Sequence, residues 1–237
     1  MQSYNVKYSQ FGACGFENKP KIGEGIYTMP DVSRILGIPN PKVRRWAKNF
    51  WDKKFADHFG GRYTFGSTRH KAVNFLTLIE FYSFIKLTEF GVWPSKIVKA
   101  HQELSEEFET KYPFAMSDVL KNIKTDGKKI YFQRNDKEIY CLDGKKQLNL
   151  DLINFFLEKV DFNTERMAEL YWPIGREYGI VCDPKRQFGQ PIILGTSIQA
   201  VTIFSMYNAG ETIDSIMDLY SINKKQVKDA IRFYKEN

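Results

Sequence analysis

Residues 28–50 read TMPDVSRILGIPNPKVRRWAKNF, and this stretch predicts two short helices joined by a tight turn. Thr28 and Asp31 have the spacing of a capping box, and Pro30 is tolerated in the first turn of a helix. Gly37 supplies the sharp turn that ends this helix. The positions that the first helix is expected to bury are Val32, Ile35 and Leu36. The first helix therefore begins after Thr28 and ends at Gly37.

The second helix carries different chemistry on its two faces. Asn40 is expected to cap it, and Pro41 to occupy its first position. The apolar stripe has the i, i+3, i+4, i+7 spacing of a helix and consists of Val43, Trp46, Ala47 and Phe50. The same phasing leaves on the opposite face Lys42, Arg44, Arg45, Lys48 and Asn49. An apolar back and an arginine-bearing front are what the reading of a DNA major groove requires.

Basic residues are concentrated around this helix. Nine lie between residues 40 and 71, namely Lys42, Arg44, Arg45, Lys48, Lys53, Lys54, Arg62, Arg69 and Lys71. Only Asp52 and Asp57 oppose them, so the window carries +7, which equals the formal charge of the whole 237-residue chain. A local excess of this size favours a polyanionic partner, usually nucleic acid, over a merely solvated lysine-rich face.

Residues 61–64, with the sequence GRYT, suit a short β-ribbon with a basic tip. We expect Arg62, Tyr63 and Arg69 to reach phosphate or the minor groove beside the second helix. The alternative is an ordinary helical hairpin with a charged outer face. The caps, the short glycine turn and the concentrated charge agree with one another and favour DNA binding.

The sequence contains few signals of a metal site, an enzyme or a membrane protein. Cys14, Cys141 and Cys182 form no CxxC pair and are typical of a reducing compartment, and the three histidines are too scattered for a metal site. No GxSxG, HExxH or glycine loop ending in Gly-Lys-Ser/Thr occurs, so we expect no catalytic residue and no cofactor. Lacking a signal pattern and any apolar run of about 18 residues, the chain is expected to be cytoplasmic and to avoid membranes.

The middle of the chain changes texture at about residue 113. Residues 129–132 and 138–142 predict a β-hairpin across Asn135 and Asp136, preceded by a short helix at 115–123. We further expect a helix over 150–160, a strand over 167–172 and a connecting loop over 173–195. Helices resume at about Gln199.

Two more helices are predicted at the C-terminus. Thr212 can cap one that buries Ile213, Ile216, Met217 and Tyr220, and Asn223 can cap another that buries Val227, Ala230, Ile231 and Tyr234. Residues 200–237 have no net charge, but the last helix is basic through Lys224, Lys225, Lys228 and Arg232. These four form a second candidate face for DNA or for a protein partner, including a second copy of the chain.

Several of these segments resemble known families. Residues 27–38, Val43-Arg44-Arg45-Trp46, Gly61-Arg62-Tyr63 and residues 75–97 resemble the winged helix-turn-helix of the MerR family. The resemblance implies that Arg44 and Arg45 meet the DNA and that Arg62 and Tyr63 meet its backbone. Trp46 stands where a tyrosine is usual, and no long coiled-coil helix follows.

The C-terminal part resembles a small trihelical domain that occurs in antitoxins of toxin–antitoxin pairs, through Asp183-Pro184, residues 188–196 (FGQPIILGT) and residues 209–231. Combined with a MerR-like head, it is similar to the long VapB-type antitoxins. That similarity implies repression of the protein's own operon and a PIN-like ribonuclease toxin as partner. Lys185 and Arg186 are candidate contacts to the acidic metal site of such a toxin.

The predicted chain is thus mainly α with a small β module. It comprises an extended segment at 1–26, a winged helix-turn-helix domain at 27–112, a linking α+β module at 113–182 and a three-helix domain at 183–237. We predict a homodimeric repressor of double-stranded DNA with an antitoxin role. The alternatives are a ligand-responsive regulator, whose pocket would be lined by Tyr131, Tyr140 and Trp172, and an architectural DNA-binding factor.

Overall fold

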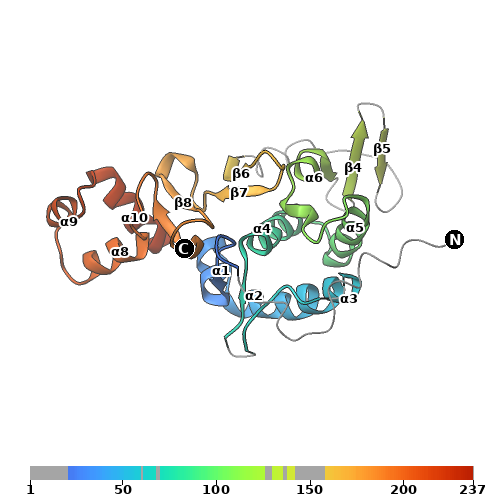
Figure 1. The fold of residues 1–237 in the computed structure, drawn as a ribbon, viewed down its shortest axis with the longest axis horizontal. Coiled ribbons are helices and arrows are strands. Elements are labelled where there is room, and N and C mark those ends of the chain that lie inside the picture. The colour runs from blue at the N-terminus through green and yellow to red at the C-terminus, as the bar shows by residue number, and fades with distance from the viewer. Residues whose placement is uncertain are drawn as a thin grey trace.

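The computed structural model describes residues 21–59, 61–67, 70–125, 130–135, 138–141 and 158–236. These residues are mainly helical and carry small antiparallel sheets, which confirms a mainly α fold with a β component. Figure 1 shows an elongated arrangement, with helices α8, α9 and α10 at one end and the N-terminal helices toward the other. A four-stranded sheet lies between these groups.

The N-terminal elements follow the predicted order. They are β1 (Tyr27–Thr28), α1 (Met29–Leu36), α2 (Asn40–Trp46), the π-helix η1 (Ala47–Phe55), α3 (Ala56–Phe59), β2 (Ala72–Val73), α4 (Phe75–Glu89) and α5 (Pro94–Glu107). The capping box of Thr28 and Asp31 is present, and Gly37 adopts the left-handed conformation with φ of 65°. Both confirm the predicted limits of the first helix.

The cap predicted for the second helix is wrong. Pro39 is the N-cap residue, and Asn40 is the first residue inside the helix. The Asn40 side chain instead binds another side chain on the helix surface, where its Oδ1 accepts a hydrogen bond from Nε of Arg44 at 2.8 Å. An asparagine used in this way cannot also bond the free backbone N–H groups of the first turn.

This second helix is longer than predicted. Helix α2, the π-helix and α3 follow one another without interruption from residue 40 to residue 59. Along the π segment Trp51 is buried and its ring stacks on that of Phe81 in α4, with centroids 3.8 Å apart. Single π-helical segments are frequent at functional sites. Here the segment extends the cationic surface beyond Asn49 to Lys53 and Lys54, both exposed.

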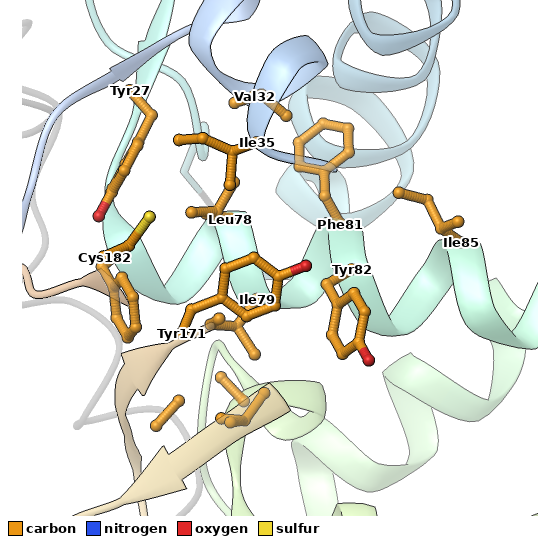
Figure 2. Packing of buried hydrophobic residues seen from close by; sticks show 14 of the residues in the cluster. Tyr27, Val32, Ile35, Leu78, Ile79, Phe81, Tyr82, Ile85, Tyr171 and Cys182 are labelled. Carbon is orange, nitrogen blue, oxygen red and sulfur yellow. The ribbon is translucent and has the colours of Figure 1, made fainter. Parts of the chain in front are cut away.

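Helix α4 is the centre of the hydrophobic core. Most of its residues are buried, including Glu80 and Ser83. Figure 2 shows Leu78 and Phe81 of this helix beneath Val32 and Ile35 of α1, while Tyr171 of strand β7 approaches it from another side. The core therefore runs continuously from the first helix into the central sheet.

The middle of the chain contains η2 (Pro113–Ala115), α6 (Ser117–Asn122), β3 (Ile123–Thr125), β4 (Ile130–Asn135) and β5 (Glu138–Cys141). Strands β4 and β5 pair antiparallel, with Phe132 opposite Tyr140, which confirms the predicted hairpin. The helix expected over 150–160 falls largely outside the described residues. The strand predicted over 167–172 is present as β7 (Ala168–Tyr171).

The connecting loop predicted over residues 173–195 is wrong. That stretch holds β8 (Ile180–Cys182) and β9 (Pro191–Ile193), together with the short 3-10 helices η3 (Arg176–Tyr178) and η4 (Gln187–Gly189). Strands β8 and β9 form one antiparallel sheet with β6 (Val160–Phe162) and β7, in the order β6-β7-β8-β9. Three-residue strands between glycines and prolines leave too short an alternation to be recognised, and pairing across the sheet stabilises them.

Three helices complete the chain: α8 (Ala200–Asn208), α9 (Ile213–Tyr220) and α10 (Lys224–Glu236). Thr212 caps α9 through its side chain, as predicted. Asn223 likewise accepts a hydrogen bond from the backbone N–H of Gln226 at 3.0 Å. Ile203, Ile216 and Val227 meet in the core of this C-terminal unit.

Candidate nucleic-acid interface

The predicted front of the second helix is exposed. Arg44, Arg45, Lys48 and Asn49 all face solvent, whereas Val43, Trp46 and Ala47 on the opposite side are buried. Lys42 differs from the others, because it is half-buried with its Nζ 4.6 Å from the centre of the Trp46 ring. The helix is thus held by its buried side and presents three cations and one amide to solvent on the opposite side.

The segment after α3 forms the second side of this surface. Phe65 and Ala72 exchange two backbone hydrogen bonds, of 2.9 and 3.0 Å, and β2 continues into a pair with β1. Arg62 is exposed next to the helix. Arg69 lies outside the described residues. We call the described residues 61–67 and 70–73 the strand loop.

Tyr63 does not occupy the place expected from the sequence. Its side chain is buried, and its hydroxyl donates a hydrogen bond of 2.8 Å to the carbonyl of Lys111. Lys111 in turn donates from Nζ to the carbonyl of Arg62 at 3.0 Å and lies 4.4 Å from the centre of the Tyr63 ring. Burial raises the pKa of Tyr63 and lowers that of Lys111. Tyr63 therefore fastens the base of the strand loop to the segment after α5, and its buried side chain is not exposed to contact DNA.

A groove of about 710 Å³ lies between the helix and the strand loop. Its charged lining consists of Arg44, Lys48, Asp52, Lys53, Arg62 and Lys71. Five cations around one carboxylate form a strongly positive concavity, which concentrates the field toward a polyanion. In the sequence, Asp52 stands out only as a charge that opposes the surrounding cations. Its position in the middle of a cationic run was the signal that could have marked it as part of the site.

The second basic face is partly committed to the protein itself. Nζ of Lys225 lies 2.5 Å from both the carbonyl of Glu177 and Oδ2 of Asp229. Arg232 packs over the ring of Tyr178 at 4.4 Å and pairs with Glu236. Lys224 and Lys228 are exposed. Two of the four predicted cations thus stabilise the contact between α10 and η3.

Lys185 and Arg186 are exposed beside a bulky apolar residue. Nζ of Lys185 lies 2.7 Å from Oε1 of Glu169, and Arg186 donates to the carbonyl of Thr196 at 3.4 Å. Two residues further on, Phe188 is 66% exposed and has a φ of 55°, a conformation that bulky residues rarely adopt. Residues 185–188 therefore present two cations and an aromatic ring on one short segment.

This segment is attached to the start of the first helix. The N–H of Ile26 donates to the carbonyl of Phe188 at 2.7 Å, and the side chain of Gln190 donates to the carbonyl of Ile26 at 3.0 Å. Gly189 packs so closely on Tyr27 that a Cβ there would lie 2.1 Å from the Tyr27 hydroxyl oxygen. Residues 188–190 are consequently docked on the start of the helix pair that carries the cationic groove.

Two of the aromatic residues proposed to line a ligand pocket are core side chains. Tyr131 and Trp172 are buried, and Trp172 donates from its indole nitrogen to Asp161 at 2.8 Å. The side chain of Tyr140 lies outside the described residues. Among the helices that the structure describes, none has the length and apolar character needed to cross a bilayer.

Comparison with known proteins places similarity at both the domain and the chain level. Residues 180–234 match the model of a family described as "Protein of unknown function (DUF433)". The chain is 24% identical over 82 residues to "Putative antitoxin VapB45" of Mycobacterium tuberculosis, a match that covers 34% of each protein. It is 26% identical over 225 residues, covering 89% of this chain and 90% of the relative, to "Uncharacterized protein Rv2308" of the same organism.

The crystal structure of Rv2018 from Mycobacterium tuberculosis has a similar fold. It superposes with a TM-score of 0.60 at 17% sequence identity, over 89% of this chain and 98% of that one. The similarity thus extends across both the helical N-terminal part and the C-terminal unit. At this identity the comparison concerns the fold alone.

Proposed function

We propose that the protein is a sequence-specific DNA-binding antitoxin that represses its own operon and neutralises a PIN-like ribonuclease toxin. The observation that carries the DNA-binding part is the positive groove between the helix at 40–59 and the strand loop. In this proposal the two elements act as the recognition helix and wing of a MerR-like winged helix-turn-helix. The helix enters the major groove, and the wing follows the adjoining backbone.

The two arginines at the front of the helix are assigned to base reading. The hydrogen bond from Arg44 Nε to Asn40 restrains the guanidinium and leaves both terminal nitrogens for a guanine edge. Arg45 is exposed beside it. Lys48 and Arg62, on opposite sides of the groove, are assigned to phosphates, where they add affinity without sequence preference.

Similarity to a protein named as an antitoxin supports the second part of the proposal. A PIN-like toxin has an acidic metal site, which favours cationic partners. Lys185 and Arg186, with the exposed ring of Phe188, are the proposed contact. Dimerisation is assigned to the C-terminal three-helix unit, where Leu219 of α9 is 65% exposed. A dimer places two N-terminal heads at half-sites one helical turn of about 34 Å, or a multiple, apart.

DNA binding is tested by titrating the protein against the DNA upstream of its own coding region and against an unrelated duplex of equal length. Replacing Arg44 and Arg45 by Ala should bring the two affinities together. Arg62→Ala should weaken both in the same proportion, because a phosphate contact carries no sequence information. Lys99→Ala, an exposed cation of α5 outside the groove, is the control and should change neither. An Arg44/Arg45 double variant with wild-type preference for the upstream DNA would overturn the assignment.

The partner assignments need separate measurements. Leu219→Asp should convert a dimer to a monomer by light scattering, and a variant that stays dimeric would place the interface elsewhere. Co-expression with a PIN-like ribonuclease from the same operon should yield a complex. Replacing Lys185, Arg186 and Phe188 by Ala together should abolish that complex while leaving DNA binding intact.

A further inference from the structure

Among the residues that the structure describes, Asp52 is the one acidic side chain that lines the cationic groove. It lies on the π-helical segment, and its side chain is 6% exposed. Its Oδ1 accepts hydrogen bonds from the backbone N–H of Thr64 at 3.1 Å and from the Thr64 hydroxyl at 2.9 Å. Its Oδ2 lies 2.5 Å from Nζ of Lys71. One carboxylate thus binds the recognition helix to both sides of the strand loop.

The two partners of Asp52 lie on either side of the backbone bridge between Phe65 and Ala72. Thr64 precedes this bridge on one side and Lys71 precedes it on the other, so holding both residues fixes the position of the bridged segments. A carboxylate that accepts charge-assisted hydrogen bonds in a largely buried place is held more strongly than an exposed ion pair. The contact spans 12 residues to Thr64 and 19 to Lys71.

For a site that only had to attract DNA, this carboxylate would be a disadvantage. It lowers the positive charge of the groove and engages the ammonium group of Lys71, which would otherwise be available to a phosphate. A residue that reduces non-specific attraction and fixes the geometry of the loop shifts the balance from non-specific toward sequence-specific DNA binding.

We propose that Asp52 is a positioning residue for DNA recognition, which holds the wing against the recognition helix and withdraws Lys71 from phosphate contact. The protein thereby gives up affinity for any duplex in exchange for preference for one sequence. This inference rests on the proposed function and names the residue that sets the specificity of that same site.

The test compares Asp52→Asn with Asp57→Asn, which makes the same charge change at an exposed position of α3 outside the groove. Asp52→Asn frees Lys71, and one added phosphate contact per protomer steepens the log–log salt slope by about 0.9. At 0.1 M salt this raises affinity for an unrelated duplex about eightfold per protomer. Affinity for the upstream DNA should rise less or fall, so that the ratio of specific to non-specific binding drops by about tenfold. Asp57→Asn should leave ratio and slope unchanged.

A second variant separates positioning from charge. Adding Lys71→Met to Asp52→Asn removes the freed cation, so non-specific affinity should return to the wild-type value while the specificity ratio stays low. A ratio restored in this double variant, or equal behaviour of the Asp52 and Asp57 variants, would overturn the proposal.

Hydrogen exchange in the absence of DNA gives a readout independent of the proposed function. The backbone N–H of Thr64 should exchange faster in Asp52→Asn than in Asp57→Asn, because it loses part of its acceptor. If the wild-type protein binds no DNA yet this difference is found, the proposed function is wrong, but Asp52 still holds the strand loop on the helix. If exchange at Thr64 is the same in both variants, the positioning role of Asp52 is wrong, whatever the protein binds.

Discussion

Glu80 and His101 form a buried pair whose disruption should be costly. Oε2 of Glu80 lies 2.8 Å from Nε2 of His101, and both side chains are 0% exposed. Oε1 of Glu80 also accepts a hydrogen bond of 2.8 Å from the backbone N–H of Phe114. The pair therefore joins α4 to α5 and to the turn at residues 113–115. The His101 ring is further stacked on Phe55 of the long helix, at 3.9 Å.

Glu80→Ala removes the carboxylate that faces Nε2 of His101 and leaves the backbone N–H of Phe114 without its acceptor, while Ser105 stays 3.3 Å from Nδ1 of the imidazole. At about 1–3 kcal/mol for each of these two groups the loss is about 2–6 kcal/mol, which spans the range of about 3–5 kcal/mol found when one member of a buried pair is removed. Glu80→Gln keeps an oxygen for Phe114 and replaces the oxygen that faces His101 by an amide nitrogen. Its cost should be smaller, about 1–2 kcal/mol.

Urea unfolding followed by tryptophan fluorescence measures these free energies, because Trp51 is buried in the same core. Glu103→Ala is the matched control, since that carboxylate is 39% exposed and lies 3.6 Å from Lys99 on the surface of α5. It should cost less than about 1 kcal/mol. A Glu80→Ala variant that unfolds within about 1 kcal/mol of this control would refute the reasoning that the pair is buried and essential.

Three further outcomes follow from buried groups elsewhere. Gly189→Ala should lower Tm by several degrees, because it combines a φ of +83° with a Cβ against the Tyr27 hydroxyl, and Tyr27→Phe should recover part of that loss in differential scanning fluorimetry. Burial raises the pKa of Tyr27, Tyr63 and Tyr171, so the folded state keeps phenol protons that the unfolded chain releases at about pH 10. Stability should therefore fall as pH rises above that value, and a urea midpoint that is flat from about pH 9 to pH 11 would contradict this. Burial also raises the pKa of the Cys182 thiol, so iodoacetamide should label its peptide at about pH 8 only after denaturation, as mass spectrometry would show.

Features that depend on neighbours in the chain were predictable from the sequence. The capping box of Thr28 and Asp31 and the left-handed turn at Gly37 involve atoms within a few residues of each other. The buried stripe of the second helix, from Val43 to Ala47, follows from the 3.6-residue period. The hairpin of β4 and β5 was predicted for the same reason, since two β-rich runs flank a short turn.

Features that depend on distant partners were not predictable. Tyr63 has the same sequence context as an exposed wing residue, but its side chain is buried and its hydroxyl donates a hydrogen bond to the carbonyl of Lys111, 48 residues later. Strands β8 and β9 are three residues long and gain their stability only by pairing in a four-stranded sheet. The packing of Trp51 on Phe81 belongs to the same class, because it joins the π-helical segment to α4.

The sequence by itself determined where the cations are concentrated and which face of the second helix carries them, because charge count and helical phase are local properties. Only the tertiary structure decided which of these charges are available to a partner. Lys71 is paired with Asp52, and Lys225 and Arg232 are engaged with the turn at residues 176–179. Pairing of this kind depends on distances between elements that are set when the core packs, and no periodicity along the chain encodes those distances.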